Sequence, residues 1–268
     1  MTADRLFSVQ DRVVVVTGGL GRLGRRFASA LVERGARVAI FDVGVDRPRP
    51  GGWTAERVMV VEADVTAKAS LEAALAQVTS AWEVPFGLVN NAALDSPPQA
   101  PIEENGPFES YPESSWDRVM EVNVKGVFLA SQVVGGAMAR AGRGSIINIS
   151  SIYGLVSPDQ RIYEYRRQQG QEFYKPVAYS ASKSALLNLT RYLATYWSGR
   201  GVRVNTMTLA GVAAGQDEAF MKGYLQKVPL GRMAAEDEYD GALVFLLSEA
   251  SRYMTGANLV VDGGWTAW

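Results

Sequence analysis

The chain has 268 residues, a net charge of −1 and no block of Lys and Arg, which argues against a nucleic acid or an anionic membrane as its partner. It contains no cysteine and no histidine, so disulfides, thiolate metal sites and cysteine or histidine catalysis are excluded, and we expect no metal. The start of the chain has no signal-peptide core and no run approaches the roughly 20 apolar residues of a membrane span, so we expect a cytoplasmic protein.

The first motif lies between two predicted strands. Residues 13–16 are a continuous β-branched run, which is typical of a strand buried on both faces of a parallel sheet. The glycine-rich segment 17–24 follows and leads into an apolar helical pattern, and the next strand, residues 38–41, ends at Asp42. Such a turn lets backbone N–H groups approach a pyrophosphate, and the acid can bind an adenosine ribose. The pattern predicts a dinucleotide site; glycines that serve turn geometry alone are the alternative.

The middle of the chain continues the alternation of strands and helices. The proline-rich segment 94–112 predicts a long loop, and the helix that follows it carries Asn123 in its middle. We predict strands at residues 58–61, 86–89 and 145–151, and helices over residues 70–80 and from Ser114 or Ser115 onward.

Several functional candidates come directly after predicted strands. They are Gly18, Asp42, Asp64, Asn90 and Ser151. Ligands of open α/β sheets bind beyond the carboxyl ends of the strands, so these residues are expected to share one site.

Tyr179 and Lys183 stand four residues apart at the start of a helical pattern. At this spacing both side chains lie on one helical face, one turn apart. A nearby ammonium stabilises a phenolate and lowers the phenol pKa from about 10, so the pair predicts a proton donor and acceptor. The alternative is an ordinary surface pair.

The C-terminal part repeats the pattern once more. It predicts strands at residues 202–208 and 258–261 and helices over residues 218–226 and 236–247. Strands and helices alternate without a break in composition over residues 1–268, which predicts an α/β fold: a single doubly wound (Rossmann) domain with a mostly seven-stranded parallel sheet flanked by helices.

These motifs together resemble the short-chain dehydrogenase/reductase family over nearly the whole chain. The resemblance implies that Ser151 hydrogen-bonds the substrate carbonyl or hydroxyl and that Tyr179 passes the proton. It implies that Lys183 lowers the Tyr179 pKa and binds the nicotinamide ribose. It further implies that Asn123 holds a water that links Lys183 to solvent.

The resemblance also implies a nicotinamide dinucleotide cofactor, a small-molecule substrate and a homodimer or homotetramer formed through the helices of Asn123 and Tyr179. The cofactor-binding residues that it implies, besides Tyr179 and Lys183, are Gly18, Gly21, Arg22, Leu23, Gly24, Asp42, Asp64, Val65, Asn91, Ala92 and Val212.

Three features depart from the family pattern. The middle glycine of the glycine-rich turn is shifted to Gly21, and Arg22 takes the usual place. Ala93 replaces the last glycine of the motif after the fourth strand. The Pro-Gly after the sixth strand is replaced within residues 208–211, a loop that normally contacts the nicotinamide amide, so the resemblance leaves the cofactor geometry there open.

The sequence thus predicts an oxidoreductase that interconverts a secondary alcohol and a ketone on a sugar-like substrate. Alternatives are a 3-oxoacyl thioester reductase and a dinucleotide-binding regulatory protein without turnover. NAD is expected rather than NADP, because the Asp42 carboxylate would repel a 2′-phosphate and the next residue is Val43. Arg22 could offset this repulsion. Within the family, the chain resembles oxidoreductases associated with nonulosonic (legionaminic-type) sugar biosynthesis.

Residues 158–176 form an insertion between Ser151 and Tyr179 and predict a substrate lid. Its aromatic, guanidinium and amide groups suit a ligand with hydroxyls, a flat base or phosphates. We therefore expect Arg166 and Arg167 to bind substrate, together with Ser151 and Tyr153. A surface excursion or a subunit contact is the alternative.

Overall fold

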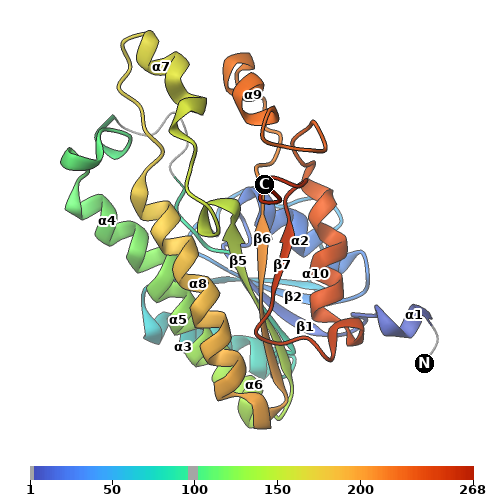
Figure 1. Cartoon of the computed structure of the whole chain (residues 1–268). Coiled ribbons are helices and arrows are strands. Elements are labelled where there is room, and N and C mark those ends of the chain that lie inside the picture. The colour runs from blue at the N-terminus through green and yellow to red at the C-terminus, as the bar shows by residue number, and fades with distance from the viewer. Residues whose placement is uncertain (1–2, 96–101) are drawn as a thin grey trace.

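Seven parallel strands form the centre of the computed structural model, which describes residues 3–95 and 102–268 (Figure 1). Their order in this described part is β3-β2-β1-β4-β5-β6-β7, and it reverses between β1 and β4, where a crevice is expected. This confirms the predicted fold class. The strands are β1 (Val13–Thr17), β2 (Arg37–Asp42), β3 (Val58–Glu62), β4 (Gly87–Asn90), β5 (Gly144–Ser151), β6 (Val202–Leu209) and β7 (Asn258–Val261).

Helices cover both faces of the sheet (Figure 1). Because side chains alternate along a strand, Val14 and Val16 of β1 pack on one face, with α2 (Arg22–Val32) and α10 (Asp240–Leu247). Val13 and Val15 pack on the opposite face. That face is covered by α3 (Lys68–Ala81), a long helix over residues 113–140 and α8 (Val177–Tyr196).

The long helix runs through α4 (Glu113–Met120), α5 (Gly126–Ala130) and α6 (Gly136–Arg140), joined by two π-helical turns, Glu121–Lys125 and Ser131–Gly135. By length and composition alone it could cross a membrane, although the sequence pattern predicted no such stretch. However, 67% of its most apolar window is buried inside the protein. It packs on the sheet with α3 and α8 as its neighbours, as expected of a core helix.

The predicted loop 94–112 is only partly described. Residues 96–101 lie outside the described residues, and the rest contains two short 3₁₀ turns, Ile102–Glu104 and Phe108–Ser110. A short N-terminal helix, α1 (Ala3–Leu6), precedes the sheet.

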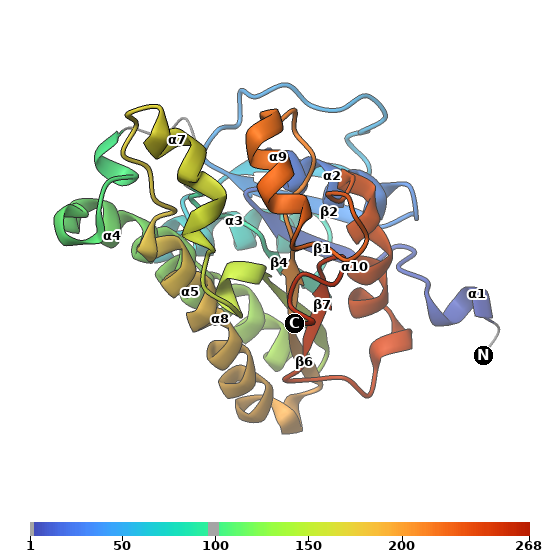
Figure 2. The same cartoon turned by 45° about the horizontal axis from the view of Figure 1, so that its top comes forward.

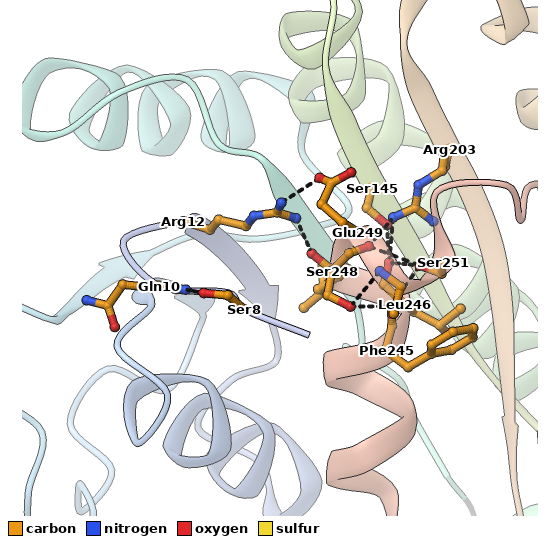
Figure 3. Close-up of polar contacts among 12 residues, drawn as sticks. Ser8, Gln10, Arg12, Ser145, Arg203, Phe245, Leu246, Ser248, Glu249 and Ser251 are labelled. Atoms are coloured by element: carbon orange, nitrogen blue, oxygen red, sulfur yellow. Dashed lines mark hydrogen bonds and ion pairs between the residues drawn. The ribbon is translucent and has the colours of Figure 1, made fainter. Parts of the chain in front are cut away.

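At the amino-terminal ends of the strands, two arginines bind the carbonyl groups at the end of α10 (Figure 3). Arg12, just before β1, donates to Leu247 O at 2.5 Å and to Glu249 at 2.6 Å. Arg203, at the start of β6, donates to Leu246 O at 2.8 Å. Cations at a helix C-terminus complement its last carbonyl groups and its dipole. These contacts stabilise the fold at the amino-terminal ends of the strands. The site is expected at their carboxyl ends.

The insertion between β5 and α8 rises above the carboxyl ends of the strands. It contains α7 (Glu164–Gln168), and Figures 1 and 2 show α7 beside α9 (Glu218–Leu225). Tyr163 of the insertion packs on Phe173 of the insertion and on Phe220 of α9, with ring centroids 4.8 Å and 5.8 Å apart, respectively. Aromatic packing of this kind fixes the insertion against α9.

Candidate active site

A cavity of about 1020 Å³ opens beyond the carboxyl ends of the strands, as predicted from the polar residues that follow them. It extends from the glycine-rich turn to Tyr179 and Lys183. Of the predicted site residues, those that line it are Gly18, Gly21, Arg22, Leu23, Gly24, Asp42, Asp64, Val65, Asn91, Ala92, Ser151, Tyr153, Tyr179, Lys183 and Val212. Asn123, Arg166 and Arg167 are absent from this lining, as is Asn90, whose buried amide donates to Ser131 and Asn148 instead.

The glycine-rich turn fits a pyrophosphate. Gly18 has a φ of +61°, and a Cβ on Gly24 would lie 2.2 Å from the carbonyl oxygen of Gly18, so both positions require glycine. The first helical backbone hydrogen bond of α2 runs from the Arg25 N–H to Gly21 O. The N–H groups of the preceding first turn, residues 22–24, therefore have no helical acceptor and can bind an anion.

Asp42 ends β2 and is buried beside this turn. Its two carboxylate oxygens accept hydrogen bonds of 2.9 Å from the N–H groups of Leu20 and Gly44. The turn and the acid thus hold each other in place. Asn91 fixes the other side of the turn, because its amide donates to the carbonyls of Thr17 and Gly18 at 3.1 Å.

Two arginines near Asp42 differ in their partners. Arg22 donates to the Glu236 carboxylate and to Ala213 O, so its guanidinium is directed at the 3₁₀ turn before α10 (Glu236–Tyr239) and at the segment after β6. Arg47 lines the cavity together with Asp42 and Val43, and it has no ion pair with a carboxylate in the described ranges. The sequence pattern singled out Arg22 and missed Arg47, which comes from the loop after β2.

Ser151 and Tyr179 both line the cavity, and the Ser151 hydroxyl is near enough to the Tyr179 phenol to favour a lower pKa of that phenol. Ser151 ends β5 and faces Tyr179, whereas the neighbouring Ser150 donates to Lys183 O at 2.9 Å. Successive strand residues point to opposite sides, which separates the two serines. The structure therefore supports Ser151 as the serine of the predicted site.

Lys183 is buried on α8 one turn after Tyr179, with its ammonium 5.8 Å from the Tyr179 ring centroid. The ammonium donates to Ile149 O at 2.9 Å. Burial lowers the pKa of Lys183 to about 8, and the charge of Asp95 opposes this shift. A smaller charged fraction at neutral pH follows, because burial penalises the ammonium.

The prediction that the Tyr179 pKa is lowered is wrong. Burial raises the Tyr179 pKa above 10.0, the charge of Asp95 adds to this, and the nearby Ser151 hydroxyl opposes it. Desolvation of the buried phenol thus decides the direction of the Tyr179 pKa, and the Lys183 ammonium does not offset it.

Asn123 lies in the first π-helical turn and clamps the backbone of Leu94. Its Oδ1 accepts from the Leu94 N–H at 2.7 Å, and its Nδ2 donates to Leu94 O and to the Ser182 hydroxyl, both at 3.0 Å. Both amide protons are thus used and the side chain is fully buried. The side chain positions the backbone before Asp95, a role that the sequence did not predict.

The predicted substrate role of Arg166 and Arg167 is not supported. Arg167 donates to Phe173 O and Gln160 O at 2.8 Å and to Glu164 at 2.7 Å, so it holds the insertion together. Arg166 stacks 5.0 Å from the Phe173 ring centroid. Both guanidiniums serve the fold of the insertion instead of facing the cavity.

Other residues form the wall above Ser151 and Tyr179. Tyr153 lines the cavity as predicted, and it belongs to the same buried cluster as Tyr163. Asp95, Tyr163, Lys175, Phe220 and Tyr224 also line it and were missed. The tyrosines of the insertion carried a signal for this, but nothing in the sequence paired them with α9.

The altered segment after β6 is ordered by tyrosines. Tyr224 accepts from the Gly211 N–H at 2.8 Å, and Tyr239 donates to Ala210 O at 3.0 Å. Val212 then forms a parallel bridge with Ala234 and lines the cavity. The segment therefore lines the cavity without the Pro-Gly of the family pattern.

Comparison with known proteins places this site in a family. A protein-family model described as "Enoyl-(Acyl carrier protein) reductase" matches residues 21–266. The chain is 30% identical over 272 residues to an NAD-dependent glycerol dehydrogenase of Listeria innocua, covering 98% of this chain and 97% of that one. It is 33% identical over 277 residues to a D-threitol dehydrogenase of Mycolicibacterium smegmatis, covering 99% and 97%.

Solved structures agree. A short chain dehydrogenase from Leptospira borgpetersenii with bound NAD⁺ superposes with a TM-score of 0.84 at 30% identity, covering 97% of this chain and 94% of that chain. A gluconate 5-dehydrogenase from Burkholderia cenocepacia in complex with NADP and tartrate gives a TM-score of 0.84 at 27% identity, with both chains fully covered.

Proposed function

The chain belongs to the short-chain dehydrogenase/reductase family, and from this premise we propose that it oxidises a secondary alcohol of a polyol to a ketone and catalyses the reverse reduction. The observation that carries the proposal is that Ser151, Tyr179 and Lys183 line one cavity together with the glycine-rich turn. A nicotinamide dinucleotide would supply hydride transfer when bound.

The residues have distinct roles in this proposal. Ser151 hydrogen-bonds the reacting oxygen and orients it toward Tyr179. The Tyr179 phenolate accepts the proton of the alcohol, and the phenol returns it to a ketone oxygen in reduction. Lys183, held by Ile149 O, lies one helical turn from the phenol and would bind the cofactor ribose. The N–H groups of residues 22–24 would hold the pyrophosphate.

We propose NAD as the preferred cofactor. The buried Asp42 carboxylate would face the 2′-position of the adenosine ribose, and Arg22 is already occupied by Glu236. The relatives do not decide the matter, since one glycerol dehydrogenase is named NAD-dependent and a gluconate 5-dehydrogenase contains NADP. Arg47, which lines the cavity together with Asp42, is the side chain that would favour the 2′-phosphate of NADP.

A polyol is favoured over the alternative acyl thioester. Both similar curated relatives reported above are named as polyol dehydrogenases, whereas the family-model description names an acyl-carrier-protein reductase. The substrate end of the cavity also carries Asp95, Lys175 and Tyr153, whose polar groups suit hydroxyls. These relatives do not include the nonulosonic-sugar oxidoreductases that the insertion resembles, so that finer assignment stays a prediction.

A regulatory protein without turnover is the second alternative. Its support was the altered segment after β6, and the hydrogen bonds of Tyr224 and Tyr239 to this segment weaken that support. Initial rates of NADH formation with glycerol, threitol and galactitol test the proposal. Turnover of a polyol supports it. Reduction of a 3-oxoacyl thioester alone, or cofactor binding without any turnover, contradicts it.

We propose one domain over residues 1–268, with segment 158–176 as a fixed wall of the substrate end that packs on α9. Phe128, Tyr192 and Tyr196 are exposed aromatic residues on the helices expected to form the dimer or tetramer. Size-exclusion chromatography with light scattering tests the assembly. The expectations of a cytoplasmic location and of no metal also stay predictions.

A further inference from the structure

An ion pair lies on the cavity wall next to the reacting centre. The Lys175 ammonium is 2.8 Å from Asp95 Oδ1, and it is 4.8 Å from the centroid of the Tyr179 ring. Both residues line the cavity that contains Ser151 and Tyr179. Asp95 comes from the loop after β4, whereas Lys175 comes from the end of the insertion, so the pair joins two distant segments of the chain at the site.

Side-chain amides hold the backbone of Lys175 and that of Leu94, the residue before Asp95. Gln160 accepts from the Lys175 N–H at 2.9 Å and donates to Lys175 O at 3.2 Å. Asn123 makes the same kind of double contact with Leu94, the residue before Asp95. A bonded backbone restricts where the side chain can reach, so the two charges are pre-positioned before any ligand binds.

The pair is unevenly exposed. The Lys175 side chain is only 9% exposed, whereas that of Asp95 is 58% exposed. An ion pair with one member in water contributes little to folding stability, because solvent screens it. Amide clamps at Lys175 and at the residue before Asp95 are therefore better explained by a ligand than by the stability of the ion pair.

The charges also favour one kind of ligand. A carboxylate or a phosphate in this position would meet the Asp95 carboxylate as well as the ammonium, so the attraction would be offset. A neutral hydroxyl can donate to Asp95 and accept from Lys175 at the same time. The rings of Tyr153 and Tyr163 complete a wall suited to a carbon chain that carries hydroxyls.

We propose that Asp95 and Lys175 bind the hydroxyl adjacent to the reacting carbon and so select vicinal diols over monohydric alcohols and hydroxy acids. This inference rests on the proposed function, because it deepens the specificity of the same site. It requires no loss of the other contacts of the two side chains, since a hydroxyl adds one donor and one acceptor to the existing pair.

A competing explanation is that the pair only straps the insertion to the loop after β4. The chain offers a matched control for a strap. Lys227 pairs with Asp159 at 2.8 Å and ties α9 to the same insertion, and neither residue lines the cavity. A Lys227→Met variant therefore removes an insertion contact without changing the cavity wall.

The test compares two alcohols that differ by one hydroxyl, 2,3-butanediol and 2-butanol, at saturating NAD. Asp95→Asn and Lys175→Met should each lower kcat/KM for the diol about tenfold or more, equivalent to about 1.4 kcal/mol, and that for 2-butanol less than about threefold. The Kd for NAD should not change. Lys227→Met should leave the ratio of the two kcat/KM values unchanged.

Three outcomes overturn the inference: equal losses for both alcohols, no loss for the diol, or the same selective loss in Lys227→Met. Asp95→Asn keeps the shape of the side chain, so it remains informative if Lys175→Met folds poorly. If the wild-type protein oxidises neither alcohol nor any polyol, the proposed function fails. The inference is then judged by calorimetric binding of 2,3-butanediol in the presence of NAD, which both variants should abolish; unchanged binding contradicts it.

Discussion

Lys183 of α8 donates a hydrogen bond of 2.9 Å to the backbone carbonyl of Ile149 in β5, and this contact lies in the protein interior. It fixes the ammonium one helical turn from Tyr179 while burial removes most of the water that would stabilise its charge. The lysine is thus held in a position that serves the site at the expense of its own ionisation.

This position predicts how stability depends on pH. The pKa of Lys183 falls from 10.5 to about 8 on folding, so between these values the unfolded chain binds more protons than the folded one. The contribution of Lys183 to the free energy of unfolding should rise with pH across this window, by on the order of 2 kcal/mol between pH 7 and pH 9.5. Urea unfolding of the wild type and of Lys183→Met at both pH values checks this. An equal change in both proteins would contradict it.

Cofactor preference should depend on Asp42 and Arg47 together. Asp42→Ala removes the carboxylate that would repel a 2′-phosphate, and Arg47 supplies a guanidinium in the same part of the cavity. We expect Asp42→Ala to raise kcat/KM for NADP relative to NAD by about tenfold or more. The Asp42→Ala, Arg47→Ala double variant should lose most of that gain. If the gain survives in the double variant, Arg47 is not the phosphate partner.

Arg167 should matter for stability and not for substrate. Its guanidinium satisfies two backbone carbonyls and Glu164 inside the insertion, and its side chain is only 18% exposed. Arg167→Ala should lower the free energy of unfolding by about 1–3 kcal/mol, because buried acceptors lose their donor. Arg161→Ala is the control, since that side chain is 83% exposed in the same segment. A tenfold rise in KM for the substrate in Arg167→Ala, with unchanged stability, would restore the substrate role.

The order and ends of the elements were predictable from local pattern. Continuous β-branched runs such as residues 13–16 have little alternative to a buried strand, and every predicted strand is found within a residue or two of its expected ends. The cofactor half of the site follows from the same logic, because glycines and acids at strand ends converge on one edge of the sheet.

The substrate half was not predictable in the same way. Which partner a long charged side chain selects depends on distant segments, as in Arg22 with Glu236 and Lys175 with Asp95. The pKa of Tyr179 was predicted in the wrong direction because spacing reports proximity but not desolvation. The expectation that Arg166 and Arg167 bind substrate stays a prediction, and the helical turn of α7 directs both side chains onto the insertion itself.

We propose that Tyr179 transfers the proton, and Tyr179→Phe removes only the hydroxyl group that would carry it. The ring and its packing remain, so the Kd for NAD should change little, while kcat for polyol oxidation should fall by about 100-fold or more. Tyr163→Phe is the matched control, because it removes another buried phenol hydroxyl from the same cavity wall and should retain most activity. A Tyr179→Phe enzyme that keeps most of its kcat would show that Tyr179 does not transfer the proton.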